Sequence, residues 1–266
     1  MALKRLLRMH FEAGVGHLGG NLSVLDTLLV LYHDVMRVDD RLVLSKGHAA
    51  GALYIALWST GRLAEDELAT FHKDGTRLSG HPPAAGLPEV PFATGSLGHG
   101  FGLACGMALA LKLSGKPGRV FCVTSDGEWN EGSTWEALHF AAHHRLDNLV
   151  TVVDVNGLQG FGTTEEVCDL SPLADKLAVH HVEVEEVDGH QPSALTACLK
   201  RSNRGLCRVV LARTHKGNGV SFMRDRMEWH YLPLSAEQYQ RAVAEIDTQA
   251  AIGACAVTID AGVTAS

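Results

Sequence analysis

Several features that define other protein classes are missing from this sequence. No run of about 18 uncharged apolar residues occurs, so we expect no membrane-spanning helix. Basic residues do not dominate: 23 Lys and Arg face 30 Asp and Glu, a formal net charge of −7, which argues against a nucleic-acid-binding surface. The six cysteines form no CxxC pair, which favours buried structural thiols in a reducing cytoplasm.

A secretory leader is also lacking at the N-terminus. Met1–Leu7 resembles the start of a signal peptide, but Arg8, His10 and Glu12 interrupt the apolar stretch that should follow. We therefore expect residues 1–13 to form a helix of the mature protein and the protein to be cytoplasmic.

What the sequence does contain is an alternation of strand-like and helical segments. Apolar runs predict strands at 42–44, 121–124, 150–153, 182–187 and 208–212. Helical periodicity predicts helices at 1–13, 21–36, 48–59, 65–73, 101–114, 133–145, 193–203 and 235–246. This order indicates one α/β domain with a doubly wound, mainly parallel sheet flanked by helices, over residues 1–246. Residues 247–266 form a C-terminal tail, either flexible or a packing arm.

Two helix starts carry residues with the spacing of N-terminal caps. Ser23 and Asp26 suggest a capping pair at the start of the 21–36 helix. Ser133 and Glu136 suggest a capping box that begins the 133–145 helix.

Asp126 and Asn156 follow two consecutive predicted strands. The carboxyl ends of parallel strands form the ligand-binding edge of an open sheet. Carboxylate and amide oxygens suit Mg²⁺ that also holds phosphates, and the backbone carbonyl of Leu158 is a natural third ligand. Asp-Gly and Asn-Gly are also common turn dipeptides, so each residue alone is equally typical of a plain turn.

Four glycine–histidine pairs come before the predicted strand that leads to Asp126: Gly16-His17, Gly47-His48, Gly80-His81 and Gly98-His99. Singly, each histidine is typical of a loop or a helix cap. Together they predict a polar pocket whose imidazoles move protons to and from sugar hydroxyls near neutral pH. Trp229-His230, after a basic glycine-containing loop, reads either as an exposed loop or as a lid that brings His230 to the pocket.

A glycine pattern, Gly100, Gly102 and Gly106, superficially matches a dinucleotide-binding fingerprint. That fingerprint requires a strand immediately before it, and the preceding segment 89–94 is broken by Pro91. An NADP-dependent oxidoreductase is therefore a weak alternative.

The motifs taken in order resemble a known family. They are Gly16–Gly20, Leu44–Ala50, Gly80–Pro82, Thr94–Gly98, Asp126-Gly127 with Asn156-Gly157, Asp188–His190 and Lys216–Met223. Together they resemble the N-terminal, diphosphate-binding domain of transketolases, most closely the N-terminal subunit of the split, two-gene type. The resemblance covers about residues 1–246.

The resemblance implies a thiamine diphosphate-binding fold and a set of roles. Asp126, Asn156 and the carbonyl of Leu158 would hold Mg²⁺, or another divalent cation such as Ca²⁺ or Mn²⁺. The cofactor would also be held by Gly127, His48, His230 and the loop of Gly95, Ser96 and Leu97. His17, His81 and His230 would line the channel for sugar phosphates. The implied reaction transfers a two-carbon ketol unit from a ketose phosphate to an aldose phosphate.

The resemblance also implies a missing half. The glutamate and the stacking aromatic that act on the cofactor's pyrimidine lie, in this family, in a second domain for which these 266 residues leave no room. We therefore expect a separate C-terminal subunit with the pyrimidine-binding domain, in an α₂β₂ assembly.

Several positions depart from the family pattern and keep alternatives open. Ser125 and Leu18 stand where Gly and Pro are usual, Gly160-Phe161-Gly162 replaces Ile-Asp-Gly, and Tyr231-Leu232-Pro233 replaces a Gly-Lys stretch. The alternatives are a specialised ketol or acyl transfer in a biosynthetic pathway, and a non-catalytic subunit kept for assembly. Another thiamine enzyme, such as a 2-oxo-acid dehydrogenase subunit or a deoxyxylulose-phosphate-type synthase, is a further one.

Overall fold

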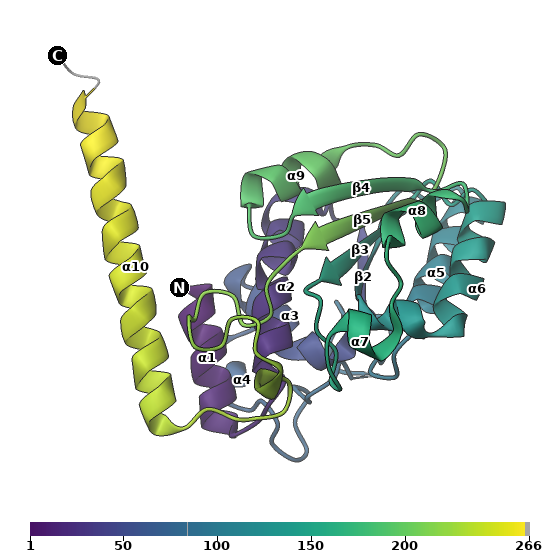
Figure 1. Ribbon diagram of the computed structural model, residues 1–266. Helices are drawn as coiled ribbons and strands as arrows, with labels where there is room; N and C mark the ends of the chain where they lie inside the picture. Colours follow the sequence, from purple (N-terminus) through teal and green to yellow (C-terminus); the bar gives the residue numbers. More distant parts are fainter. Residues whose placement is uncertain (84, 264–266) are drawn as a thin grey trace.

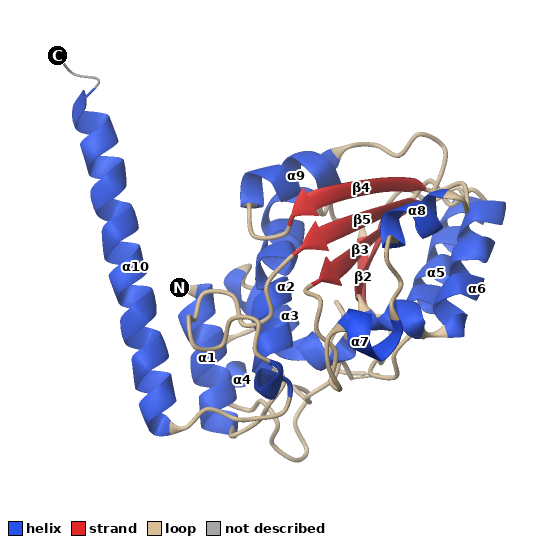
Figure 2. Cartoon of the chain, viewed as in Figure 1, coloured by secondary structure: helices blue, strands red, loops and turns tan. Residues whose placement is uncertain are grey.

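A five-stranded parallel sheet forms the centre of the computed structural model, which describes residues 1–83 and 85–263. The strands are β1 (Arg41–Leu44), β2 (Val120–Ser125), β3 (Leu149–Val155), β4 (Glu183–Asp188) and β5 (Arg208–Arg213). Their order in the sheet is β1-β2-β3-β5-β4, and every neighbouring pair is parallel. Figure 2 shows the part of this order from β2 through β3 and β5 to β4. The predicted doubly wound α/β architecture with a parallel sheet is confirmed.

Helices cover both faces of this sheet (Figure 1). They are α1 (Ala2–Ala13), α2 (Leu18–Val30), α3 (Ala50–Ser59), α4 (Glu65–Leu68), α5 (Gly100–Leu113), α6 (Gly132–His143), α7 (Thr164–Cys168), α8 (Leu173–Ala178), α9 (Pro192–Lys200) and α10 (Ala236–Val263). A π-helical turn, Leu31–Val35, continues α2, and short 3₁₀ turns follow β1 (Gly47–Ala49), β2 (Gly127–Asn130) and the basic loop (Met227–His230).

Two apolar cores lie on the two faces because side chains alternate along each strand. Phe121 and Val123 of β2 face the core made with α1, α2, α3 and α9. Val120 and Cys122 of the same strand face the core made with α5 and α6. The central strands are buried on both faces, which explains why they read as continuous apolar runs in the sequence.

Helix boundaries differ from the prediction where side chains have tertiary partners. Ser23 does not cap α2, which begins at Leu18: it is buried inside the helix and donates hydrogen bonds to the Gly20 carbonyl and to Asp154. Asp26 instead contacts His190 at 2.8 Å. The capping box at Ser133 is also wrong, because α6 begins at Gly132 and the Ser133 hydroxyl donates to the carbonyl of Gly98 at 3.0 Å.

The lengths of two other helices also differ from the prediction. The 65–73 helix is only one turn, α4, and the last helix runs beyond residue 246 to Val263. The first turns of α10 pack on α1, where the rings of Tyr239 and Phe11 stack with centroids 4.5 Å apart. Among the described residues, no helix is long and apolar enough to cross a membrane.

Candidate active site

A cavity of about 230 Å³ opens where the carboxyl ends of β1, β2 and β3 meet the loops that precede α2 and follow β5. The candidate metal, cofactor and channel residues from the sequence line it except Ser96, which is exposed beside Gly95 and Leu97. Of the four glycine–histidine pairs, Gly98-His99 does not place its imidazole in this cavity: His99 is exposed, and its ring contacts the Leu97 carbonyl at 3.0 Å. The lining residues are His17, Gly20, His48, His81, Gly95, Leu97, Ser125, Asp126, Gly127, Asn156, Leu158, Gln159, Gly160, Phe161, Lys216, His230 and Tyr231. The topology thus gathers residues from distant segments of the chain at one edge of the sheet.

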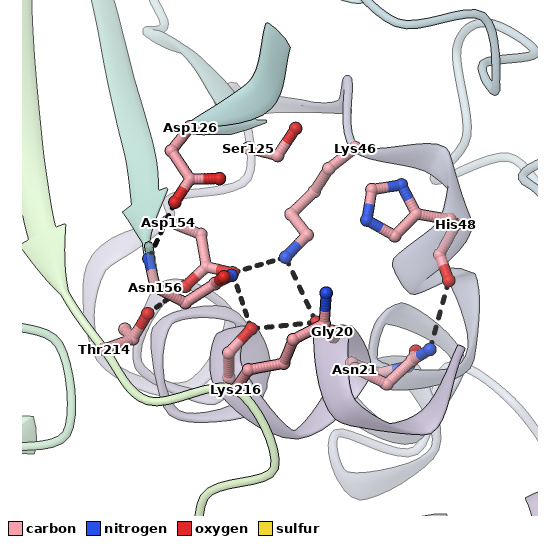
Figure 3. Close-up of polar contacts among 12 residues, drawn as sticks. Gly20, Asn21, Lys46, His48, Ser125, Asp126, Asp154, Asn156, Thr214 and Lys216 are labelled. Atoms are coloured by element: carbon pink, nitrogen blue, oxygen red, sulfur yellow. Dashed lines mark hydrogen bonds and ion pairs between the residues drawn. The ribbon is translucent and has the colours of Figure 1, made fainter. Parts of the chain in front are cut away.

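Asp126 and Asn156 meet because their strands are adjacent and in register. Ser125, the last residue of β2, pairs with Asp154 of β3, so the residues that follow each strand end side by side. One carboxylate oxygen of Asp126 accepts from the amides of Asn156 and Gly157 at 3.0 and 2.7 Å, and the other accepts from Gly127 at 2.8 Å. Figure 3 shows the carboxylate turned toward the Asn156 backbone.

Asp154 is a buried carboxylate that the sequence analysis did not single out. It accepts hydrogen bonds from Lys46 and Thr214, from Ser23 at 2.6 Å and from the Asn156 side-chain amide at 3.1 Å (Figure 3). Burial alone would raise the pKa of Asp154, but the lysine and the hydroxyl donors outweigh it and lower the pKa below its usual range. Its signal was present: Asp154 is the one charged residue within the apolar run 149–155.

Two lysines place positive charge at the cavity, Lys216 in its lining and Lys46 buried next to it. Lys46 is fully buried and donates to Asp154 and to the Gly20 carbonyl, the latter at 3.1 Å. Lys216, from the loop after β5, reaches the carbonyls of Leu158 and Gln159 at 3.3 and 3.5 Å. Burial and the neighbouring Lys46 lower the pKa of Lys216 to about 8. Lys46, Asp126, Asp154 and Lys216 are called the charged floor below.

The charged floor leaves one carboxylate under electrostatic repulsion. Burial raises the pKa of Asp126 to about 6, and the repulsion of Asp154 adds to that rise. A cation bound to Asp126 would relieve this repulsion. Among the described residues, no three His, Cys, Asp or Glu side chains are grouped as metal ligands, so a cation here would need carboxylate, amide and carbonyl oxygens together. Asp126, Asn156 and the Leu158 carbonyl are such a set, and it suits Mg²⁺.

Four histidines from four separate segments also line the cavity and are here called the histidine wall: His17, His48, His81 and His230. The ring of His17 lies 5.7, 5.9 and 5.1 Å from the rings of His48, His81 and His230. Burial lowers the pKa of all four, and with the help of Lys216 it lowers that of His230 to about 3. The imidazoles are therefore neutral near pH 7, and positive charge for an anion comes from the lysines, not from protonated histidine.

Asn21 holds part of this wall through the backbone. Its amide donates to the carbonyls of His17 and His48 at 2.8 and 3.1 Å, and its carbonyl oxygen accepts from the Ala52 amide at 2.7 Å (Figure 3). His17 adopts a left-handed backbone, φ 61°, and its amide donates to the His230 carbonyl at 3.0 Å. The Asn21 side chain thus joins the main chains of His17 and His48, and a main-chain bond joins His17 to His230, while the three residues line the cavity.

Ser125, a departure from the family pattern, bonds to a neighbouring carboxylate. Its amide and hydroxyl donate to one oxygen of Glu128 at 2.8 and 3.3 Å, while the other oxygen of Glu128 accepts from Ser45 and from the Gly98 amide. The serine side chain therefore belongs to a buried network that joins β1, β2 and the 95–99 loop.

The dinucleotide alternative lacks its structural context. α5 does begin at Gly100, but residues 85–99 contain no strand. The pyrophosphate fingerprint needs a strand that leads directly into the glycine loop.

Comparisons with known proteins agree with the geometry. Residues 4–251 match the family described as transketolase, thiamine diphosphate binding domain. The chain is 38% identical over 251 residues to the 6-deoxy-6-sulfo-D-fructose transketolase subunit of a Clostridium species, covering 90% of this chain and 91% of that protein. It is 37% identical over 254 residues to a subunit of the apulose-4-phosphate transketolase of Phocaeicola vulgatus, covering 91% and 90%.

Longer relatives match over part of their length. Human transketolase is 37% identical over 255 residues, which are 89% of this chain and 39% of that protein. The structure of transketolase from Leishmania mexicana superposes with a TM-score of 0.82 at 27% identity, covering 92% of this chain and 40% of that one. The chain therefore spans about 40% of the length of these transketolases.

Proposed function

Since this chain belongs to the transketolase family, we propose that it is the diphosphate-binding subunit of a transketolase-type transferase. The observation that carries the proposal is the charged floor itself. Asp126, Asn156, Leu158 and Lys216 line one cavity, and Lys46 is buried next to it in a pair with Asp154, which provides ligands for a cation and charge for a diphosphate together. When bound, thiamine diphosphate supplies the carbanion that attacks a ketose carbonyl.

In this proposal the chain's own residues divide the work. Asp126, Asn156 and the Leu158 carbonyl hold Mg²⁺, or Ca²⁺ or Mn²⁺ in its place. Lys46 and Lys216 attract the diphosphate, and Gly127, His48 and the loop of Gly95, Ser96 and Leu97 hold the cofactor. An amide ligand at Asn156 adds an oxygen without adding negative charge next to an anionic group.

The histidine wall would accept protons from the sugar hydroxyls and return them. His17, His81 and His230 present neutral imidazoles to the cavity, and a neutral imidazole accepts a proton from a hydroxyl that ionises during the transfer. His230 also contacts Lys216 at 3.1 Å, which supports a position for His230 between the sugar and the diphosphate.

The substrates and the partner follow from the relatives. Two relatives of similar length are named as subunits, and their names give different sugars, 6-deoxy-6-sulfo-D-fructose and apulose 4-phosphate. We therefore infer a ketose donor and an aldose acceptor, with sugar phosphates as the first class to test. A separate subunit with the pyrimidine-binding domain would complete the site, in an α₂β₂ assembly in the cytoplasm.

The test uses the chain co-expressed with the reading frame next to its gene. Wild-type complex should bind thiamine diphosphate with Mg²⁺ in calorimetry and transfer ketol units across a panel of sugar phosphates. Asp126→Asn should weaken Mg²⁺-dependent binding by at least ~100-fold, since loss of even an outer-shell partner costs about 10- to 100-fold. Asp147→Asn, in an exposed pair with Lys112, is the matched control and should leave binding unchanged.

Two results would contradict the proposal. Full Mg²⁺-dependent binding by Asp126→Asn would refute the metal assignment. Full transfer rates by this chain alone, with cofactor and Mg²⁺, would refute the need for a second subunit.

A further inference from the structure

Tyr231 lines the cavity at the protein surface. It follows His230 directly, and its hydroxyl donates to the carbonyl of Gly160 at 2.7 Å. Its ring also meets the ring of His230 edge to face, with centroids 4.7 Å apart. Tyr231 thus joins the segment that carries His230 to the turn after β3 that carries Leu158.

The contact with Gly160 requires the absence of a side chain there. A Cβ on Gly160 would lie 2.5 Å from the Tyr231 hydroxyl, which is closer than real contacts allow. The φ angle of Gly160 is not in the left-handed region, so the restriction at this position is steric and not conformational. Gly160 and Tyr231 are both departures from the family pattern, and the structure places them against each other.

The main chain of Tyr231 is held on the opposite side by the first glycine loop. A Cβ on Gly16 would lie 2.3 Å from the Tyr231 carbonyl oxygen. The next residue of that loop, His17, donates its amide to the carbonyl of His230 at 3.0 Å. Gly16, Gly160 and Tyr231 together form what we call the clasp.

The clasp acts on the turn that carries the proposed metal ligand Leu158. Three consecutive carbonyls of this turn accept from side chains across the cavity: Leu158 and Gln159 from Lys216, and Gly160 from Tyr231. An anionic ligand competes for the ammonium of Lys216, which weakens its hold on the turn. The neutral hydroxyl of Tyr231 carries no charge for such a ligand to attract, so its bond can hold the turn in both situations.

We propose that Tyr231 is a positioning residue that fixes the 157–162 turn and thereby presets the Leu158 carbonyl for the divalent cation. The proposal rests on the function proposed above and deepens it. Preorganisation of a ligand raises affinity because less order has to be imposed on binding. The expected signature is a change in Mg²⁺ affinity with unchanged turnover once Mg²⁺ is saturating.

The test combines hydrogen exchange of the protein without cofactor and Mg²⁺ titration of the assembled complex. Tyr231→Phe removes only the hydroxyl, so amides 157–162 should exchange faster. The Mg²⁺ concentration for half-maximal thiamine diphosphate binding should rise by about 2- to 12-fold, the value of one hydrogen bond. Tyr239→Phe is the matched control, because that ring stacks on Phe11 away from the cavity.

A double-mutant cycle tests the contact itself. Gly160→Ala should disturb the turn in the wild-type background and have no further effect when Tyr231→Ala has already removed the ring. Gly106→Ala is the matched control, since a Cβ there meets no atom within 4 Å. Tyr231 is 55% exposed, so neither tyrosine variant should prevent folding.

The outcomes separate this inference from the proposed function. Unchanged exchange of the turn and unchanged Mg²⁺ dependence in Tyr231→Phe would overturn the clasp, as would additive effects of Gly160→Ala and Tyr231→Ala. Failure of the wild-type complex to bind thiamine diphosphate would instead sink the proposed function and, with it, the assignment of Leu158 to a metal. Faster exchange in Tyr231→Phe together with a higher Mg²⁺ requirement supports the clasp.

Discussion

The charged floor and the histidine wall adjoin the same cavity and meet where Lys216 contacts His230, yet they are built in opposite ways. Each buried charge of the floor has hydrogen-bonded partners: Asp154 accepts from four side chains, and Lys46 donates to two groups. Within residues 1–83 and 85–263, the imidazoles of His17, His48 and His81 make no hydrogen bond to another residue. The charges of the floor are hydrogen-bonded within the protein, whereas these three imidazoles leave their ring nitrogens open to a ligand; His230 contacts Lys216.

The difference follows from the cost of burial. An ionised group cannot be taken out of water without an opposite charge and donors around it, so the floor needs its network to exist at all. A neutral imidazole costs far less to bury and can be left unpaired at the edge of a cavity. His17 and His48 therefore keep their imidazoles unbonded and are secured through their main-chain carbonyls, which accept from the Asn21 side chain.

Removing Asp154 from the charged floor should give the largest loss of stability. Asp154→Ala leaves Lys46 buried without its counterion, which should lower the free energy of unfolding by about 3–5 kcal/mol in urea titrations. The exposed Lys112–Asp147 pair provides the control, and Asp147→Ala should cost under ~1 kcal/mol. An unchanged urea midpoint for Asp154→Ala would show that the floor is not a structural network.

The contact of His10 with the loop that carries His17 should make the stability of the protein sensitive to acid. His10 is buried and contacts the Gly16 carbonyl at 3.0 Å, and burial lowers its pKa to about 4. The unfolded chain takes up this proton near pH 6.5 and the folded chain only near pH 4, so stability falls as the pH drops through that window. This loss amounts to at most roughly 3 kcal/mol.

His10→Asn, which keeps a donor but does not titrate, should remove that share of the acid sensitivity. Urea unfolding of both proteins from pH 7.5 to 4.5 measures it. If the two curves stay parallel across this range, His10 is not the acid-sensitive support.

Asn21 should matter to the wall more than to the floor. Asn21→Ala removes the donor to two histidine carbonyls and leaves the Ala52 amide without its acceptor, which should cost about 1–3 kcal/mol of stability. It should also slow ketol transfer by displacing His17 and His48. The control is Asn203→Ala. The Asn203 amide donates to the Leu149 carbonyl, which does not line the cavity, so this variant should affect stability alone. Equal loss of transfer in both variants would contradict a special role for Asn21.

The smallest effect is expected at Ser125. Ser125→Gly loses the long hydroxyl contact to Glu128 at 3.3 Å but keeps the backbone bond at 2.8 Å. Stability should change by under ~1 kcal/mol, and thiamine diphosphate affinity by no more than about twofold. A large gain in affinity on calorimetry would mean that this serine obstructs the diphosphate.

The sheet and the edge that carries the site could be predicted because their signals are local. Apolar runs, helical periodicity and the motifs around Asp126 and Asn156 are readable along the chain. The helix starts near Ser23 and Ser133 could not be predicted, because both hydroxyls donate hydrogen bonds to residues far along the chain: Ser23 to Asp154, and Ser133 to the Gly98 carbonyl. A capping pattern and a tertiary contact use the same residue types, and spacing alone does not separate them.

The sequence by itself determined the architecture, the positions of Asp126 and Asn156 after two neighbouring strands and the histidines of three of the four glycine–histidine pairs, which line the cavity, because each depends on periodicity or on short motifs. Only the tertiary structure decided where the charges stand and which groups are ionised. The pairing of Lys46 with Asp154 joins residues 108 positions apart, and the reach of Lys216 to Leu158 spans 58. Burial and charge proximity set pKa values, and both arise only when the chain has folded.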